Sequence, residues 1–267
     1  MVKRILVSLA LAVAGAAHAA SIARVISPVS LVLTSSGARE VTALDGKPVL
    51  YCGLATFETW AMPLVGQAVR STPDAGITVS VDARDVSLVG LMVRSGWLQP
   101  PELDDDAQAA IAEGRGGWAC AKAETPFVLM HTSVDPKVLA GIALNESAYN
   151  GRAWPWTLNV AGRGFFFRSR DDAYGAMRAL IAAGRYDFDV GIMQVNWRYH
   201  RQRFASPWDA LAPATNIHVA EAILNENYSR THSIAKAIAY YHSANPVPGG
   251  AYLARFVRNL NQIQAGL

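Results

Sequence analysis

Apolar residues recur at helical spacing through the second half of the chain. Leu139, Ile142 and Ala143 lie three or four positions apart, which places them on one face of a helix. Asp135 followed by Pro136 is typical of a helix start, with an N-cap residue and a proline in the first turn. Segments 169–184, 213–228, 233–241 and 250–263 show the same spacing. This half therefore predicts a mainly helical domain of about 140 residues, with an irregular, aromatic-rich stretch at 152–168.

The first half carries a different pattern. Short β-branched and aliphatic runs alternate with turn residues, which indicates short strands. The runs are 25–26, 29–33, 48–54 and 77–81. Helices are expected at 61–69, 86–94 and 102–114. Residues 25–122 thus favour a small β-rich barrel or sandwich with helices.

The first 19 residues have the pattern of a signal peptide. Lys3 and Arg4 precede an apolar run at 5–14, and residues 17–19 read Ala-His-Ala, a typical cleavage site. The apolar run is short for a membrane span. We therefore expect export to the periplasm or the medium, with no membrane span after cleavage and a mature chain that starts at Ala20.

Composition supports a folded protein without a nucleic-acid partner. The chain of 267 residues is 51% hydrophobic and 17% charged, enough to bury a sizeable core. Its formal charge falls from +3 to +1 without the signal peptide, because that segment carries two basic residues and no acidic one. No basic tract remains, so a neutral or mixed-charge partner is expected.

The chain has two cysteines, Cys52 and Cys120. Two thiols on an exported chain favour a disulfide, with two buried free thiols as the alternative. The bridge would close a loop of about 69 residues within the N-terminal part, worth roughly 4 kcal/mol in loop entropy.

Glu146 is the first candidate for chemistry. It extends the apolar face of the 135–146 helix by one turn, so its carboxyl should point towards the interior or a cleft. Burial disfavours the charged form and raises the pKa, which suits a general acid. The alternative is a solvated glutamate or an ion-pair partner at a helix end.

Four motifs, in order along about 100 residues, give the second half a specific resemblance. They are Glu146-Ser147-Ala148-Tyr149, Gly191-Ile192-Met193-Gln194-Val195-Asn196, Pro213-Ala214-Thr215-Asn216-Ile217 and Ala239-Tyr240-Tyr241-His242. Residues 125–265 resemble the lytic transglycosylases with a goose-type lysozyme-like fold. The resemblance implies a catalytic domain at 123–267 that cleaves the β-1,4 bond between N-acetylmuramic acid and N-acetylglucosamine in peptidoglycan. It also implies a 1,6-anhydro sugar end as product, and no cofactor.

The same resemblance implies roles for individual residues. Glu146 would be the catalytic acid and base, and Tyr241 would orient it. Substrate contacts are implied for Ser147, Tyr149, Met193, Gln194, Asn196 and Tyr241. The physical chemistry agrees for Gln194 and Asn196, whose amides suit sugar hydroxyl and amide groups. Met193 taken alone would be expected in the core, although the thioether also offers an adaptable apolar surface to a ligand.

Asp189 leaves a second reaction open. If it faces Glu146 across a water molecule, it would be the second carboxylate of an inverting hydrolase, a true muramidase. The alternative is an aspartate that caps a turn. The histidines show no paired ligand spacing, and we predict no metal.

The N-terminal part, residues 25–122, weakly resembles the thermonuclease-like OB-fold family. The resemblance rests on segments 54–59, 93–98 and 107–119. Leu50 and Ala55 stand where that family has an arginine and a metal-binding aspartate, and Glu58 matches its catalytic glutamate. Phosphodiester hydrolysis requires a metal or arginines to hold the phosphate charge. A degenerate docking module is therefore implied, rather than a nuclease.

The leading hypothesis is an exported lytic transglycosylase. The resemblance implies that such enzymes open the wall for secretion or conjugation machines, which the N-terminal module could engage. A hydrolytic muramidase and a non-catalytic wall-binding assembly protein are the alternatives.

Overall fold

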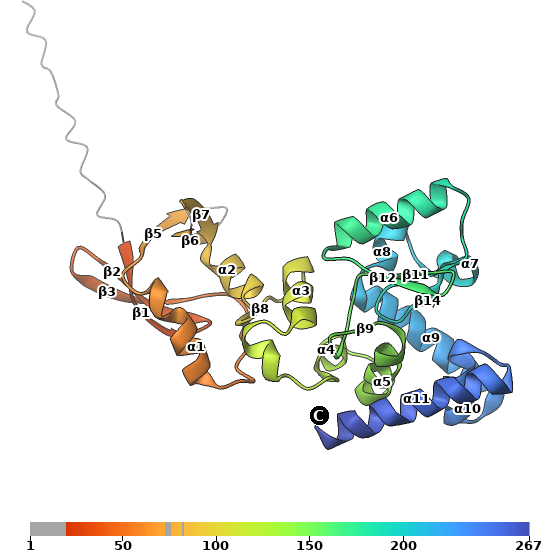
Figure 1. Cartoon of the computed structure of the whole chain (residues 1–267). Coiled ribbons are helices and arrows are strands. Elements are labelled where there is room, and N and C mark those ends of the chain that lie inside the picture. Colours follow the sequence, from red (N-terminus) through yellow and green to blue (C-terminus); the bar gives the residue numbers. More distant parts are fainter. Residues whose placement is uncertain (1–19, 73–75, 82, 267) are drawn as a thin grey trace, which may run out of the picture.

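The computed structural model describes residues 20–72, 76–81 and 83–266. The predicted signal peptide, residues 1–19, lies outside them. Figure 1 shows the strand-rich N-terminal part at one end and the helices of the C-terminal part at the other. In the described ranges, no helix combines the length and apolar character needed to cross a membrane.

A six-stranded antiparallel sheet dominates the N-terminal part. Its strands are β1 (Ala20–Ser27), β2 (Ser30–Ser35), β3 (Ala38–Ala43), β5 (Ala68–Thr72), β6 (Gly76–Val81) and β7 (Arg84–Ser87). The order is β3-β2-β1-β5-β6-β7, which leaves β3 and β7 as the two edges in the described part of the chain. The sheet is therefore open, and the expected OB-like barrel is not supported.

Two helices cover the buried side chains of this sheet. They are α1 (Leu54–Ala61) and α2 (Leu88–Arg94), and Phe57 and Met92 are fully buried between helices and sheet. The expected helix at 61–69 is wrong: a short 3-10 turn, η1 (Met62–Leu64), is followed by Gly66 at a φ of +86° and then by β5. The expected strand at 48–54 shrinks to β4 (Lys47–Pro48), which pairs with β8 (Leu98–Gln99).

The helix α3 (Asp105–Glu113) and the 3-10 helix η2 (Gly116–Cys120) complete this part. Asp104 caps α3 by accepting a hydrogen bond from the Ala107 amide at 2.8 Å, and Gly114 ends it in the left-handed conformation, as the acidic start and glycine stop predict. Cys52 and Cys120 form the predicted disulfide, with a Cα–Cα distance of 5.2 Å.

The C-terminal part is mainly helical, as predicted. Its helices are α4 (Thr125–Leu129), α5 (Pro136–Glu146), α6 (Arg170–Ala182), α7 (Trp197–His200), η3 (Arg201–Arg203), α8 (Pro207–Ala210), α9 (Pro213–Thr231), α10 (Ile234–His242) and α11 (Pro246–Ala265). Helix α5 is central to the core, since Leu139, Ile142 and Ala143 are fully buried. Helix α11 packs along α5, where the side chain of Asn145 donates to the Tyr252 carbonyl at 3.1 Å.

The stretch expected to be irregular forms a small antiparallel sheet. Strands β11 (Thr157–Val160), β12 (Arg163–Phe166), β13 (Phe188–Val190) and β14 (Val195–Asn196) lie in the order β12-β11-β13-β14. A two-residue turn with positive φ at Ala161 and Gly162 joins β11 to β12. Asn150 and Gly151 make the same kind of turn between β9 (Ala148–Tyr149) and β10 (Arg152–Ala153). An Asn-Gly pair is typical of such hairpin turns, because both residues tolerate positive φ.

Polar contacts join the two parts. Arg152 on β10 donates to the carbonyl oxygens of Trp118 and Ala119 at 3.2 and 2.9 Å. Arg170 pairs with Asp105 at 3.6 Å. Leu103 packs against the buried clusters of both parts, so α3 and η2 lie at their junction.

Candidate active site at Glu146

Glu146 is the last residue of α5, and its side chain is partly exposed. The neighbouring core removes water from the carboxyl, and this burial raises the pKa of Glu146 to about 8. The glutamate is therefore largely protonated at neutral pH. A carboxylic acid in this state can donate a proton to a bound substrate.

Three charged or polar side chains modulate this acid. The hydroxyl of Tyr252 on α11 interacts with the carboxyl and lowers its pKa, the negative charge of Asp189 raises it, and the positive charge of Arg255 lowers it. These effects are smaller than that of burial. Tyr252 is 1% exposed, and its hydroxyl has no hydrogen bond of standard geometry among the described residues. It thus remains available to Glu146.

Tyr241 on α10 is the tyrosine expected to orient the glutamate. Its hydroxyl donates to the Met193 carbonyl at 2.8 Å. Burial, followed by the negative charges of Glu146 and Asp189, raises its pKa well above the usual value. Tyr241 is therefore a neutral hydrogen-bond donor within electrostatic reach of both carboxyls, and it holds the 191–196 loop rather than Glu146 directly.

Asn216 on α9 fixes the same loop from the other side. It is fully buried, and its Oδ1 accepts a hydrogen bond from the Met193 amide at 2.8 Å. Its Nδ2 donates to the carbonyls of Val190 and Ala210, both at 3.0 Å. A Cβ atom on Gly191, whose φ is +83°, would collide with this amide. The Pro213–Ile217 motif thus supplies an anchor for the Gly191–Asn196 motif.

The side-chain amide nitrogens of Gln194 and Asn196 in this loop have defined partners, whereas Gln194 Oε1 is buried without one in the described ranges. The side-chain amide of Gln194 donates to the carbonyls of Gly191 at 2.8 Å and Thr157 at 3.2 Å, and Gln194 has a φ of +48°. Asn196 donates to Asp189 Oδ1 at 2.8 Å. This bond lowers the pKa of Asp189, yet burial dominates and the pKa is raised overall. The charge of Asp189 acts on Glu146, and one of its carboxylate oxygens already accepts a hydrogen bond from Asn196.

The other residues expected to bind substrate differ in exposure. Ser147 is fully buried, and its hydroxyl donates to the Ile192 carbonyl at 2.7 Å, so it ties α5 to the loop and has no exposed surface for a glycan. Met193 is also fully buried, in agreement with core packing. Tyr149 is 43% exposed and stacks on Phe166 with ring centroids 5.0 Å apart.

The structure thus brings Glu146, Tyr241 and Asp189 together and joins them to the loop through Met193 and Asn196. Sequence reasoning missed Tyr252 and Arg255 on the last helix. Tyr252 directly precedes Leu253, the first residue of the apolar face that the helical spacing identifies, and so it was not singled out. Sequence reasoning also missed the anchoring role of Asn216. A buried asparagine inside a helix would have been the signal, since such an amide needs several partners.

A glutamate with a raised pKa beside two buried tyrosines is an arrangement suited to acid–base chemistry. Residues 129–246 match the family model of the transglycosylase SLT domain, a family that comprises peptidoglycan lytic transglycosylases, so this part of the chain is similar to that family. No curated protein and no solved structure matches the chain. The resemblance of residues 25–122 to the thermonuclease-like OB fold gains no support from these comparisons.

Proposed function

We propose that the protein is an exported lytic transglycosylase that cleaves the β-1,4 bond between N-acetylmuramic acid and N-acetylglucosamine in peptidoglycan. The observation that carries the proposal is the raised pKa of Glu146, to about 8, within an SLT domain. Cell-wall glycan lies outside the cytoplasm, which agrees with the signal-peptide pattern of residues 1–19.

In the proposed reaction, Glu146 first gives its proton to the glycosidic oxygen as the bond to the anomeric carbon breaks. The resulting carboxylate then takes the proton of the muramic acid 6-hydroxyl, whose oxygen attacks the anomeric carbon. The product ends in a 1,6-anhydro sugar, and Glu146 is protonated again. Because the nucleophile belongs to the sugar, the reaction needs no second protein carboxylate.

The surrounding residues would keep Glu146 ready for both steps. Burial stabilises its neutral form for the first step, while the Tyr252 hydroxyl and the Arg255 charge stabilise the carboxylate of the second. Tyr241 and Asn216 would hold the 191–196 loop in place for the sugar. For Gln194 and Asn196, direct contact with the glycan stays a prediction, as it does for Tyr149.

A hydrolytic muramidase is the second candidate, because Asp189 acts on the pKa of Glu146 through its charge. In that reaction Asp189 would activate a water molecule. Asp189 already accepts a hydrogen bond from Asn196, and burial raises its pKa. The hydrogen bond occupies one oxygen and weakens Asp189 as a base, whereas burial strengthens it. The transglycosylase reaction is favoured because it needs no second carboxylate.

The test is mass analysis of the fragments released from purified peptidoglycan. The wild type should release fragments with 1,6-anhydromuramic ends, and Glu146→Gln should lower the rate at least 100-fold. Glu102→Gln is the control, since Glu102 is exposed and distant in sequence from the site. Fragments heavier by one water that disappear in Asp189→Asn would establish the muramidase instead. Binding to peptidoglycan without any fragments would support a wall-binding assembly protein.

The N-terminal module is proposed to dock the enzyme on a secretion or conjugation machine. Its support is the open edge strand β3, where Val41 is 67% exposed. A photo-reactive residue at position 41 should cross-link to a component of such a machine in the cell envelope. Cross-links to peptidoglycan alone would contradict this role.

A further inference from the structure

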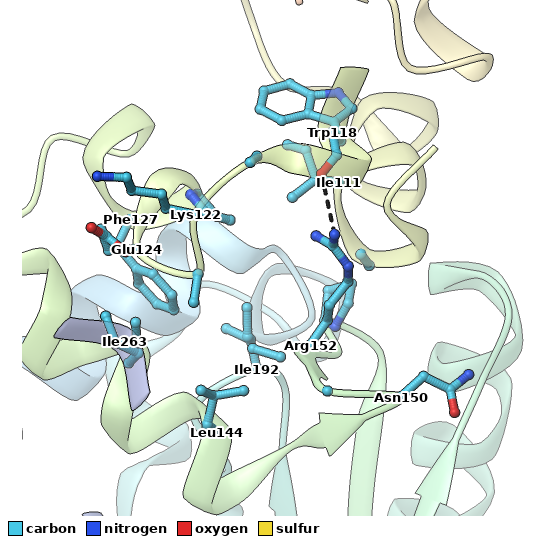
Figure 2. Close-up of a pocket in the computed structure, with 18 of the residues that line it drawn as sticks. Ile111, Trp118, Lys122, Glu124, Phe127, Leu144, Asn150, Arg152, Ile192 and Ile263 are labelled. Carbon is cyan, nitrogen blue, oxygen red and sulfur yellow. Dashed lines mark hydrogen bonds between the residues drawn. The ribbon is translucent and has the colours of Figure 1, made fainter. Parts of the chain in front are cut away.

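A cavity of about 370 Å³ lies where the N-terminal and C-terminal parts meet, apart from Glu146. It is walled by α3 and η2 on one side and by α4, α5, β10 and the end of α11 on the other. Figure 2 shows Phe127, Leu144, Ile192 and Ile263 along its apolar wall. Its volume falls within the usual range for small-ligand sites.

Arg152 brings a positive charge to this cavity. One nitrogen, Nη2, donates to the carbonyls of Trp118 and Ala119. Figure 2 shows the bond to Trp118. No carboxylate in the described ranges lies within 4 Å of the guanidinium, and burial lowers the pKa of Arg152. A Cβ atom on Gly114 would approach the guanidinium to 2.8 Å, so the glycine that ends α3 makes room for it. An arginine has five N–H donors, and several here are free for an anion.

Gln108 adds a neutral polar group. The residue lines the cavity from α3 and is only 5% exposed. Its side-chain amide makes no hydrogen bond to any residue in the described ranges. The amide atoms are not completely enclosed by protein and Gln108 lines the cavity, so a ligand there with both a donor and an acceptor would pair with them.

Glu124 supplies an acceptor on the other side of the cavity. Its Oε2 is buried without a hydrogen-bond partner. Figure 2 shows Glu124 across the cavity from Arg152, with Phe127 and Ile192 between them. The walls therefore offer a cation at one side, a carboxylate at the other, and apolar side chains with one amide between.

We propose that this cavity binds the carboxyl end of a short peptide with small apolar side chains. The terminal carboxylate would pair with Arg152, the peptide amide with Gln108, and an N–H group with Glu124, while the side chains lie against Phe127 and Leu144. A fatty acid would satisfy Arg152 and the apolar wall but would leave Gln108 and Glu124 unpaired. A free inorganic anion would leave the apolar wall empty.

Isothermal titration calorimetry with full-length mature protein tests the proposal. The probes are N-acetyl-D-alanyl-D-alanine, N-acetyl-L-alanyl-L-alanine and decanoate. We expect at least one dipeptide to bind, with affinity at least tenfold lower in Arg152→Gln and several-fold lower in Gln108→Leu. Arg178→Gln is the matched control, because Arg178 is exposed on α6 and should leave affinity unchanged. Preference for the D form would indicate peptides of the bacterial wall, and preference for the L form would indicate protein chain ends.

Three results would overturn the proposal: no heat from either dipeptide at 10-fold excess over millimolar protein, binding of decanoate alone, or equal dipeptide affinity in the wild type and Arg152→Gln. If Arg152→Gln fails to fold, Gln108→Leu decides by the same criterion. Calorimetry needs no turnover of glycan, so this result is independent of the proposed lytic activity.

Discussion

The side-chain amide of Asn216 occupies the space that a Cβ atom on Gly191 would need. Gly191 also has a φ of +83°, which disfavours any other residue. Two motifs 25 positions apart are therefore packed against each other, and the glycine is required for two separate reasons. This contact sets the shape of the loop that carries Met193 and Gln194 beside the Glu146 site.

Comparison of Gly191→Ala with a control glycine should separate the backbone strain at positive φ from the clash with Asn216. Gly162 is the matched control, since it has a φ of +81° and open space around its Cβ position. Gly162→Ala should lower the free energy of unfolding by about 1–2 kcal/mol through backbone strain alone. Gly191→Ala should lower it by about 2 kcal/mol more, because the clash displaces Asn216. Urea unfolding measures both, and equal losses would refute the packing argument.

Asn216→Ala removes three hydrogen bonds from a fully buried side chain. At about 1 kcal/mol for each bond, the free energy of unfolding should fall by about 3 kcal/mol. Glycan cleavage should fall as well, since the Met193 amide loses its partner. Asn261→Ala on exposed α11 surface is the control and should change stability by less than about 0.5 kcal/mol. A loss as small as in the control would mean that Asn216 does not anchor the loop.

The Cys52–Cys120 disulfide should stabilise the N-terminal part. It spans 68 positions, and loop entropy predicts a contribution of roughly 4 kcal/mol. The double variant Cys52→Ser, Cys120→Ser should therefore unfold at lower urea concentration. Titration of free thiols in the denatured protein should give two thiols per chain after reduction and none before. Two thiols without reductant would show that the bridge does not form in the protein.

The sequence predicts α5 well because every signal for it is local. Asp135 caps the helix and Pro136 is its first residue, as expected, and Glu146 stands in its last turn on the predicted apolar face. Ser169 caps α6 through an equally local contact, by accepting a hydrogen bond from the Asp172 amide. The small sheet was missed because its pairings depend on turns with positive φ, which a hydrophobic pattern does not report.

The candidate site was predictable only in part, for the same physical reason. Glu146 is recognisable from its place on an apolar helical face. Tyr252 and Arg255 reach it from α11, more than 100 positions later, so only the packing of α11 on α5 identifies them. The buried position of Ser147 likewise follows from tertiary packing, which a motif cannot show.

The pH dependence of cleavage should report the state of Glu146. Its pKa is raised to about 8, so kcat/KM should be constant from about pH 6 to 7 and fall about tenfold per pH unit above 8. The release of fluorescent fragments from labelled peptidoglycan at pH 6–10 measures this fall in kcat/KM, which is the alkaline limb of the pH profile. Glu102→Gln should show the same profile as the wild type. A limb centred near pH 5 would mean that Glu146 is ionised in the free enzyme.

The free energy of unfolding should also depend on pH, because Glu146 has different pKa values in the folded and the unfolded states. The pKa of Glu146 is 4.5 in the unfolded chain and about 8 in the folded state, so the folded state binds the proton more tightly. Its stabilising contribution is full below pH 4.5 and is lost as the pH rises through 8. Glu146→Gln cannot titrate. Its advantage over the wild type should grow across this window to a few kcal/mol, on the order of 4 at most because the carboxyl is partly exposed. A constant difference across the window would contradict the raised pKa.

Tyr252→Phe should move the alkaline limb of cleavage without removing the ring from the core. The Tyr252 hydroxyl lowers the pKa of Glu146, so its loss should raise that pKa and shift the limb to higher pH. The rate at the plateau should also fall, because the carboxylate formed after proton donation loses a hydrogen-bond donor. The Tyr252 ring stacks on His242 with ring centroids 5.1 Å apart, and phenylalanine keeps this ring, so stability should change little.

Tyr240→Phe is the matched control for Tyr252→Phe. Tyr240 lies on α10, is 39% exposed and is not among the groups that shift the pKa of Glu146. The control should keep the wild-type pH profile. The same holds for the replacement of any tyrosine that acts only through packing. Movement of the limb in Tyr252→Phe alone would assign the effect to the hydroxyl beside Glu146. If the limb stays in place while stability falls, Tyr252 supports the fold, and the hydroxyl has no part in setting the acid.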